Sequence, residues 1–579
     1  MKFMLSYLKR YKGLVAACMS LKLLGTVLEL LLPYVLEYLI DTVAPTKNLR
    51  LVALWGGAML ALTVLVRVTN VTANRISVKS AKSAAYDIRR DLFWHSINLS
   101  GSQADQFGLP SLTSRMTSDS YNVQNFLQSG QALGVRAPIM LVGGIIVTMT
   151  MDVGLAAILC VMAPIMLAVA IGVSLRGIPL YDKVQQSVDE IVRIMRENIT
   201  GIRVVKALSK EDYERRRFAA ANQTMTRRDR KAGVVMALPG PLMTLALNIG
   251  LTLAVIVGAV RVNAGVTQPG VILAFLTYFN MILMGVMGLN RVFMMMSKAT
   301  ASAKRIQAVI DQPEGLEPLP EGQAARQEQE GYVVFDHVSF RYGEADVTHE
   351  GIQMALNDLS FTMKRGGSLG IIGSTGSGKT TVINLLMRFY DATEGHIFVD
   401  GKDVRTYDKD SLHRKFGVVF QNDVIFAASL AENIDFGRDV DEDGIRAAAA
   451  SAMARDFIEA YDDTYQHQAA IHGANLSGGQ RQRVLIARAL AAKPDILVLD
   501  DSSSALDYRT DAALRKVIRE QYRDTTTIVV AQRVSSIMSL DDIIMLDEGE
   551  VIGHGTHAEL MASCPQYREI YQTQMGEGA

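Results

Sequence analysis

Residues 373–380, in the second half of the chain, form a pattern that binds phosphate groups. They are Gly373, Ser374, Thr375, Gly376, Ser377, Gly378, Lys379 and Thr380. They match G-x-x-x-x-G-K-[ST], and they stand between an expected strand at residues 368–372 and an expected helix at residues 381–390. The glycines let backbone N–H groups surround the phosphates, and the helix N-terminus adds its dipole. We predict that Lys379 neutralises phosphate charge here and that the Thr380 hydroxyl binds Mg²⁺.

A short apolar run that ends in a carboxylate is the metal-binding candidate. Residues 496–500 read Ile-Leu-Val-Leu-Asp, which predicts a buried strand with Asp500 at its end. An aspartate at this place can hold Mg²⁺ directly or through a water molecule. The alternative is a buried strand followed by an ordinary turn aspartate, which the phosphate loop upstream disfavours.

A second glycine-rich segment comes before an expected helix at residues 481–492. It consists of Leu476, Ser477, Gly478, Gly479 and Gln480. A serine and two glycines at a helix N-terminus form another possible anion site. One nucleotide cannot readily occupy two such loops of one small domain, so a second copy from another chain could share it.

The elements that must position these loops belong to a chain of several domains. The chain has 579 residues and a formal charge of zero, from 59 basic and 59 acidic side chains, so a nucleic-acid partner is not expected. Its three cysteines are far apart and form neither a disulfide framework nor a zinc site within the chain. The hydrophobic residues make up 49% of the chain, which is high for a purely soluble protein.

Six apolar segments in the first half predict a membrane domain. A spanning helix needs roughly 20 mostly apolar residues. Five segments contain long stretches without a formal charge, at residues 51–66, 137–151, 153–175, 232–260 and 262–290. The first segment, about residues 13–40, is the least apolar because it contains Lys22, Glu29 and Glu37. Basic residues before it place the N-terminus in the cytoplasm.

Two long charged connections and a polar linker divide the chain further. Residues 67–136 and 176–231 are rich in Lys and Arg, contain few prolines and predict helices that project into the cytoplasm. They are either solvated helical faces or rigid stalks that transmit force. Residues 311–330 are rich in Pro, Glu and Gln and predict a linker. The predicted domains are therefore residues 1–310, the linker 311–330 and residues 331–579.

Taken together, these motifs resemble those of an ATP-binding cassette exporter half-transporter. The resemblance covers nearly the whole chain and implies a six-span α-helical transmembrane domain followed by an α/β P-loop nucleotide-binding domain. It implies ATP and Mg²⁺ as cofactors, with Thr380, Gln421 and Asp500 at the metal. Tyr342 resembles the aromatic residue that stacks on adenine, and Thr381 follows the phosphate loop within the same site. A segment resembling the loop that crosses the dimer interface contains Ser504, Ala505, Leu506 and Asp507.

The resemblance also implies where this chain docks and how it assembles. The stretches at residues 104–112 and 209–218 resemble the cytoplasmic loop tips that dock on nucleotide-binding domains. In the family, each ATP lies between the phosphate loop of one chain and the Leu-Ser-Gly-Gly-Gln loop of another. This predicts a multi-pass protein of a bacterial cell membrane with a cytoplasmic nucleotide-binding domain. Its partners would be the lipid bilayer, a second half-transporter and an unidentified exported substrate.

Two departures from the family pattern fall on one ATP site. Asp501 stands where the family usually has a catalytic glutamate, and Gln532 stands where it usually has a histidine. The loop before Leu476, at residues 470–473, also lacks the usual glutamate. This pattern resembles the degenerate-site subunit of a heterodimeric exporter, which binds ATP and hydrolyses it slowly. A homodimer with two slow sites, and a nucleotide-gated channel or regulatory membrane subunit, are the alternatives.

The residues of the membrane half leave the substrate open. The methionines Met281, Met284, Met287 and those at residues 294–296 either line an adaptable apolar pocket or fill helix packing. Glu29 is an acid within the first span, a place where ionisable residues are commonly functional. It could attract a cationic substrate, form an interhelical hydrogen bond or face water.

Overall fold

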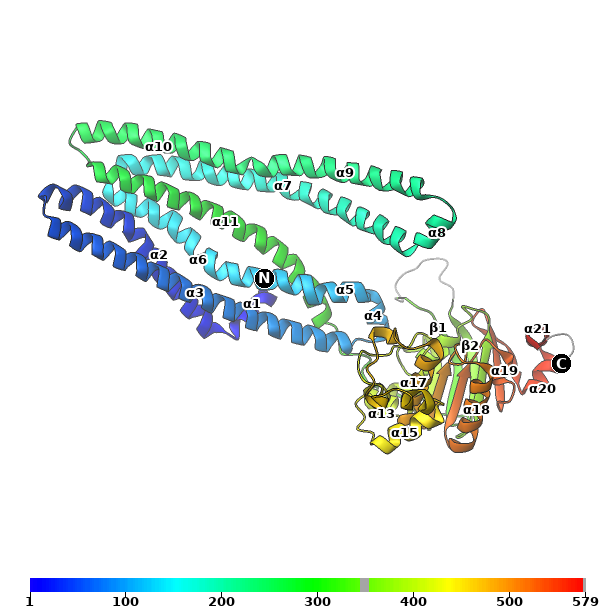
Figure 1. The fold of residues 1–579 in the computed structure, drawn as a ribbon. Helices are drawn as coiled ribbons and strands as arrows, with labels where there is room; N and C mark the ends of the chain where they lie inside the picture. The colour runs from blue at the N-terminus through cyan, green and yellow to red at the C-terminus, as the bar shows by residue number, and fades with distance from the viewer. Residues whose placement is uncertain (344–353, 576–579) are drawn as a thin grey trace. The chain divides into compact units, whose positions relative to one another are not determined.

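The computed structural model describes residues 1–343 and 354–575, and it divides into two compact units (Figure 1). The membrane unit comprises Met1–Ile97 and Leu109–Gln312. The nucleotide unit comprises Asn98–Gly108 and Pro313–Ala579. A short segment between two membrane-unit helices therefore belongs to the nucleotide unit, although more than 200 residues separate it from Pro313.

All regular secondary structure in the described residues of the membrane unit is helical. Its elements are α1 (Lys2–Lys9), α2 (Lys12–Tyr38), η1 (Leu39–Val43), η2 (Ala44–Thr46), α3 (Leu49–Ile97), α5 (Leu109–Ser114), η3 (Arg115–Asp119), α6 (Ser120–Met151), α7 (Val153–Thr200), α8 (Ile202–Ala207), α9 (Glu211–Ala237), α10 (Pro239–Asn263) and α11 (Pro269–Ile310). Six of the resulting helical segments are long and apolar enough to cross a membrane. They confirm the six predicted spans.

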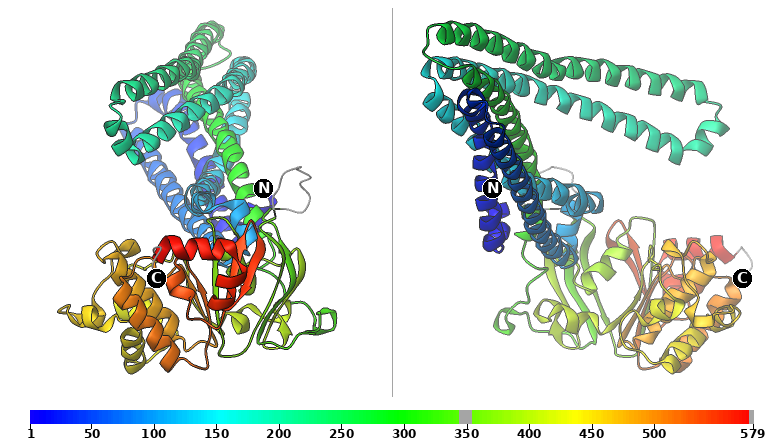
Figure 2. Two further views of the ribbon diagram at one scale, coloured as in Figure 1. Left: turned by 90° about the vertical axis from the view of Figure 1, so that its right-hand side faces the viewer. Right: turned by 60° about the vertical axis from the view of Figure 1, so that its left-hand side comes forward.

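The charged connections are helical, as predicted. Helix α3 continues for 49 residues, and α7 continues for 48. Helices α7 and α9 run side by side and meet at α8 (Figures 1 and 2). The second loop tip was predicted at residues 209–218, but this prediction was wrong in part. The chain reverses at α8 and residues 208–210, and α9 begins at Glu211, where acidic residues in its first turn favour a helix N-terminus.

The nucleotide unit contains both helices and strands. Its elements are α4 (Gly101–Phe107), η4 (Glu321–Gln323), β1 (Val333–Phe340), β2 (Leu356–Met363), β3 (Ser368–Gly373), α12 (Lys379–Leu386), β4 (Glu394–Val399), β5 (Lys402–Asp403), η5 (Val404–Thr406), α13 (Lys409–His413), β6 (Phe416–Val419), α14 (Leu430–Asp435), α15 (Glu442–Ser451), α16 (Arg455–Glu459), η6 (Thr464–Gln466), η7 (Ile471–Gly473), α17 (Gly478–Ala491), β7 (Ile496–Asp500), α18 (Tyr508–Gln521), β8 (Thr526–Val530), α19 (Val534–Ile537), β9 (Asp542–Asp547), β10 (Glu550–Gly555), α20 (His557–Ser563) and α21 (Pro565–Met575).

Two sheets organise this unit. The larger sheet has the strand order β10-β9-β3-β8-β7-β6, in which β10 is antiparallel and the other neighbouring strands are parallel. The smaller, antiparallel sheet has the order β2-β1-β4-β5. The predicted strand at residues 496–500 coincides with β7, and β3 extends the predicted strand at residues 368–372 by one residue. Parallel strands align their carboxyl ends, which is where α/β folds place ligands.

Two predicted helices differ from the observed ones at their ends. The helix expected at residues 381–390 is α12, which begins two residues earlier and ends at Leu386. The helix expected at residues 481–492 is α17, which begins at Gly478 because the Ser477 side chain caps it. Ser477 Oγ accepts a hydrogen bond from Gln480 N, and Gln480 Oε1 accepts one from Ser477 N, at 3.2 and 2.8 Å. This reciprocal capping box starts the helix inside the glycine-rich segment.

Helix α4 is held on the nucleotide unit by hydrogen bonds and close packing. Gly101 N donates to Phe389 O at 3.1 Å, and Tyr390 OH donates to Asp105 Oδ2 at 2.6 Å. A Cβ atom at Gly101 would lie 2.8 Å from Phe389 O, so the approach requires glycine. Burial and the bond to Asp105 raise the pKa of Tyr390, which keeps its hydroxyl a donor. The predicted tip at residues 104–112 thus begins within a docked helix.

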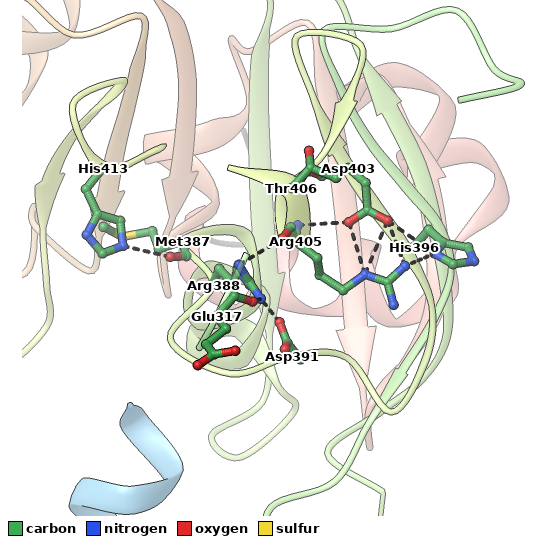
Figure 3. Close-up of polar contacts among 9 residues, drawn as sticks. All are labelled: Glu317, Met387, Arg388, Asp391, His396, Asp403, Arg405, Thr406 and His413. Atoms are coloured by element: carbon green, nitrogen blue, oxygen red, sulfur yellow. Dashed lines mark hydrogen bonds and ion pairs between the residues drawn. The ribbon is translucent and has the colours of Figure 1, made fainter. Parts of the chain in front are cut away.

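The linker is fastened to the nucleotide unit through Arg388 (Figure 3). The Arg388 guanidinium donates to Glu317 O at 2.9 Å and to Arg405 O at 3.0 Å, and it pairs with Asp391. Leu319 N also donates to Arg405 O, at 2.7 Å. Around Glu317 and Leu319, the predicted linker is therefore held against the nucleotide unit by hydrogen bonds.

A buried arginine joins helix α17 to neighbouring segments of the nucleotide unit. Arg488 donates to Asn433 O at 2.7 Å, to Asn433 Oδ1 at 2.9 Å and to Val424 O at 3.0 Å. Its side chain is 8% exposed, and its guanidinium lies 3.7 Å from Asp423. Because Asp423 and Val424 closely follow Gln421, this network fixes α17 relative to the segment that contains that glutamine.

The Arg488→Met substitution is expected to destabilise the nucleotide unit by about 3–5 kcal/mol, because it leaves buried acceptors and Asp423 without their cation. Arg455→Met is the control, since Arg455 is 58% exposed and makes an i,i+4 pair with Glu459 at 3.1 Å. The control should cost less than about 1 kcal/mol. Denaturant unfolding of the full chain would measure the free energy of unfolding of both variants. Equal losses of this free energy would contradict the assigned role of Arg488.

Candidate nucleotide-binding site

The phosphate loop lies between β3 and α12, at the carboxyl end of the parallel sheet. Gly378 is the N-cap of α12 and has φ of 98°, a conformation that favours glycine. A Cβ atom there would lie 2.5 Å from Ala355 O, so packing also excludes a side chain. The loop therefore presents backbone N–H groups, together with the positive end of α12, toward the space above β3.

Lys379 folds back over this loop. Its ammonium group donates to Gly373 O at 3.0 Å and to Ser374 O at 2.5 Å. Burial lowers the pKa of Lys379, while the carboxylates of Asp500 and Asp501 oppose that shift. A nucleotide phosphate offers the ammonium a charged acceptor in place of neutral carbonyls, which gives stronger hydrogen bonds.

Thr380 and Asp500 form an oxygen pair suited to a hard cation. Thr380 Oγ1 donates to Asp500 Oδ2 at 3.1 Å, and Asp500 is only 2% exposed. Burial raises the pKa of Asp500, and the Thr380 hydrogen bond and Lys379 oppose this effect. Oxygen ligands from one carboxylate, a hydroxyl and phosphates are typical of Mg²⁺ sites, so these residues fit that ion.

A pocket of about 380 Å³ collects most of the predicted nucleotide residues. Its lining consists of Tyr342, Ala355, Thr375, Gly376, Gly378, Lys379, Thr380, Thr381, Gln421, Asp500, Asp501, Val530, Ala531 and Gln532. Three loop residues, Gly373, Ser374 and Ser377, contact Lys379 but are not in this lining. The sequence analysis did not predict Ala355, Val530 and Ala531 as pocket residues. Val530 and Ala531 could have been predicted, because they lie at the carboxyl end of the buried apolar strand β8.

Tyr342 lines the pocket and is 41% exposed. Its hydroxyl lies 3.1 Å from Thr381 Oγ1 and accepts a hydrogen bond from Asn384 at 3.4 Å. Its ring packs edge-on against Phe340 and Tyr390. An aromatic ring held in this way and partly exposed beside the phosphate loop has the flat, accessible face that stacking on a base requires.

Asp501 and Gln532 both line the pocket and are in direct contact. Gln532 Nε2 donates to Asp501 Oδ2 at 2.8 Å. Burial raises the pKa of Asp501, while this hydrogen bond acts in the opposite direction. Asp501 has φ of 51°, a left-handed conformation that aspartate tolerates better than most residues. The two residues that depart from the family pattern are thus direct partners.

The residues from Leu476 to Gln480 do not line this pocket in the described part of the chain. They start α17 beside Ala505, where a Cβ atom added at Gly478 would lie 3.9 Å from the Ala505 Cβ and one added at Gly479 would lie 3.3 Å from the Ala505 carbonyl oxygen. Ser504, which precedes Ala505 in the sequence, donates from Oγ to Asp501 O at 2.9 Å. Asp507, which follows Ala505 by two residues, is the N-cap of α18. The segment 504–507 thus connects the phosphate pocket to the second glycine-rich loop, while Leu506 is buried.

Comparison with known proteins identifies the family. Residues 15–287 match the ABC transporter transmembrane region, and residues 356–504 match the ABC transporter family. An uncharacterised ABC transporter ATP-binding protein of Mycobacterium tuberculosis is 34% identical over 576 residues, which cover 98% of this chain and 97% of that protein. The chain belongs to the ABC transporter family. YfiB of Bacillus subtilis, an uncharacterised ABC transporter ATP-binding protein, is also 34% identical over 99% of this chain and 98% of its own length.

A solved structure shares the fold of this ABC transporter. A bacterial Atm1-family ABC exporter with ATP bound gives a TM-score of 0.82 at 24% identity, covering 98% of this chain and 99% of that chain. The protein is therefore a multi-pass membrane protein with an exporter fold and a cytoplasmic ATP-binding domain. It belongs to the transporters that couple ATP hydrolysis to transport.

Tyr342→Ala should weaken ATP binding about tenfold, because stacking on one base contributes roughly 1–3 kcal/mol. Tyr342→Phe keeps the ring and removes only the hydroxyl contacts with Thr381 and Asn384, so its affinity should stay within about twofold. Isothermal titration of the purified transporter with ATP would compare the variants. A loss in Tyr342→Phe as large as in Tyr342→Ala would show that the hydroxyl matters and the ring does not.

Proposed function

We propose that this chain is one subunit of a heterodimeric exporter. It binds ATP at a site that hydrolyses it slowly, and it supplies Leu476 to Gln480 to the hydrolytic site of its partner. The direct pairing of Asp501 with Gln532 carries this proposal. Both residues line the pocket and are joined by a hydrogen bond of 2.8 Å.

Asp501 is poorly suited to polarise an attacking water. Its carboxylate is one methylene, roughly 1.5 Å, shorter in reach than that of the usual glutamate. A misplacement of about 1 Å can reduce the rate around 10²-fold. The amide of Gln532 also occupies one carboxylate oxygen, and an amide can neither exchange a proton nor carry positive charge.

The second glycine-rich loop has groups suited to bind a phosphate of another chain. Ser477 caps a helix of 14 residues whose first positions are glycines. These residues lie outside the pocket that contains Lys379. A nucleotide that contacts both kinds of loop therefore requires two chains, which supports a dimer with ATP shared between the subunits.

Within the pocket, each residue has a distinct proposed role. Tyr342 stacks on the base, Lys379 neutralises phosphate charge and the loop N–H groups orient the phosphates. Thr380, Gln421 and Asp500 would hold Mg²⁺, which when bound would neutralise phosphate oxygens. Asp501 and Gln532 would orient water near the terminal phosphate without extracting its proton efficiently. Binding and closure would thus be retained while hydrolysis is slow.

The purified chain on its own should bind ATP and hydrolyse it about 10²-fold more slowly than the complex with its partner. The reason is that any homodimer contains Asp501 and Gln532 at both sites. Phosphate release at saturating ATP, with the oligomeric state verified by light scattering, would measure this. Fast Mg²⁺-dependent turnover by a verified homodimer would favour the homodimeric alternative.

In the assembled complex, Ser477→Ala should lower ATP turnover more than Lys379→Ala. Ser477 would donate to the partner's ATP in the transition state, and loss of one such donor costs on the order of 10²–10³-fold. Lys379→Ala affects the site that is already slow, so it should weaken ATP binding and reduce turnover less. Steady-state ATPase rates at saturating ATP would compare them.

Ser477→Ala also removes a helix cap, so a control must separate that effect. Ser429→Ala removes the equivalent cap of α14, where Ser429 forms a capping box with Glu432. This control should retain nearly full turnover, because Ser429 lies in neither the pocket nor the second glycine-rich loop. Equal losses from Ser477→Ala and Lys379→Ala would indicate two equivalent sites, and a smaller loss from Ser477→Ala would reverse the assignment.

A further inference from the structure

Three ionisable side chains of the membrane unit form a cluster deep within its spanning helices. Arg136 NH2 lies 2.8 Å from Glu29 Oε1, which joins α6 to α2. Lys22 is two helical turns from Glu29 on the same face of α2, and electrostatic interactions link it to both partners. We refer to Lys22, Glu29 and Arg136 as the basic cluster, because its formal charge is +1.

The basic cluster lies far from the ends of its helices. Arg136 is about 22 Å along α6 from Met151, and Glu29 is about 21 Å from Val43, at 1.5 Å per residue. The hydrocarbon core of a bilayer is about 30 Å thick, so Glu29 and Arg136 fall within it, toward the cytoplasmic half. Lys22 lies seven residues farther along α2, near the cytoplasmic boundary of the core. Ionisable residues at such depth are costly and are commonly functional.

Two other acids of the membrane unit have partners near helix ends. Asp152 accepts from Leu155 N and pairs with Arg261 at 3.0 Å, and Asp41 accepts from Gly270 N and Val271 N. These contacts join one helix to another, so both charges have a structural role.

The basic cluster is less complete. Glu29 Oε2 and Arg136 Nε are buried and have no hydrogen-bonding partner among the described residues. Arg136 is nevertheless accessible, since its side chain is 37% exposed, and Glu29 is 19% exposed. Lys22 is 3% exposed and donates to Asn70 at 3.0 Å. The cluster thus combines a net positive charge with an arginine that is accessible and has a hydrogen-bond donor to spare. Such an arginine is suited to bind an anionic group.

Helix α11 lies against this part of α6. A Cβ atom at Gly288 would lie 3.4 Å from the Cβ atom of Ala137, which follows Arg136. Glu29, which as an isolated acid could attract cations, is instead paired with Arg136. Glu37, the other acid of this span, lies eight residues from Glu29 in the direction away from Lys22, about 12 Å along the helix. The charge left at the basic cluster itself is positive.

We propose that the basic cluster binds the anionic group of an amphipathic exported substrate, with Arg136 as the contacting residue and Lys22 as a supporting charge. The carboxylate, sulfonate or phosphate of the substrate would accept from the Arg136 guanidinium, and its apolar part would lie among the spanning helices. This inference builds on the exporter function and does not depend on which ATP site hydrolyses.

The test compares two fluorescent probes that differ in one charge. The anion 11-(dansylamino)undecanoic acid and its uncharged primary amide would be titrated, without nucleotide, into the assembled transporter in phosphatidylcholine nanodiscs, with empty nanodiscs as blank. The acid should bind about tenfold more tightly than the amide, since a charge-assisted hydrogen bond contributes that much or more. Equal binding of both probes by the wild-type transporter would overturn the proposal, and this comparison requires no substitution.

Substitutions then separate a binding role from a structural one. Arg136→Gln and Lys22→Met should each weaken binding of the acid and leave binding of the amide unchanged, whereas Glu29→Gln should preserve or strengthen acid binding. Arg261→Gln is the matched control, because it removes an arginine paired with a buried acid at a helix end, and it should change neither. If Glu29→Gln weakens acid binding as much as Arg136→Gln, the pair merely holds α2 to α6 and the proposal is wrong.

Discussion

One hydrogen bond, from Thr380 Oγ1 to Asp500 Oδ2, joins the two parts of the phosphate site. It connects the start of α12 to the end of β7, and β8 lies between β3 and β7 in the sheet. The bond can form only because parallel strands bring their carboxyl ends to one edge. The same edge places Asp501 directly after β7 and Gln532 shortly after β8. The site therefore depends on strand order more than on the conformation of a single loop.

The two units use buried charge in different ways. In the nucleotide unit, the buried Arg488 side chain binds three acceptors, and the buried Asp500 carboxylate accepts from Thr380, which fixes both side chains. In the membrane unit, Glu29 and Arg136 each retain a buried atom that has no hydrogen-bonding partner within the described residues. A rigid network suits a site whose ligand is always the same nucleotide. An incomplete one suits a ligand that arrives from outside the chain and completes it.

Sequence reasoning predicted the six spans, the strand that ends at Asp500 and the phosphate loop, because each follows from local periodicity or a fixed spacing. It could not give contacts between distant segments. The hydrogen bond between Gln532 and Asp501 follows from the parallel pairing of β7 and β8, and that between Tyr390 and Asp105 crosses 285 positions. Helix ends also differed, because a capping box at Ser477 can start a helix on glycines that composition alone assigns to a loop.

The docking of α4 has a consequence for biosynthesis. This helix belongs to the nucleotide unit but is translated more than 200 residues before Pro313. Its docking surface at Phe389 and Tyr390 therefore emerges from the ribosome long after α4 itself. Domains generally fold as units during synthesis, with N-terminal parts first. The first cytoplasmic loop must remain undocked until Phe389 and Tyr390 have been synthesised, so chain termination before that point would leave α4 without its partners and open to proteases.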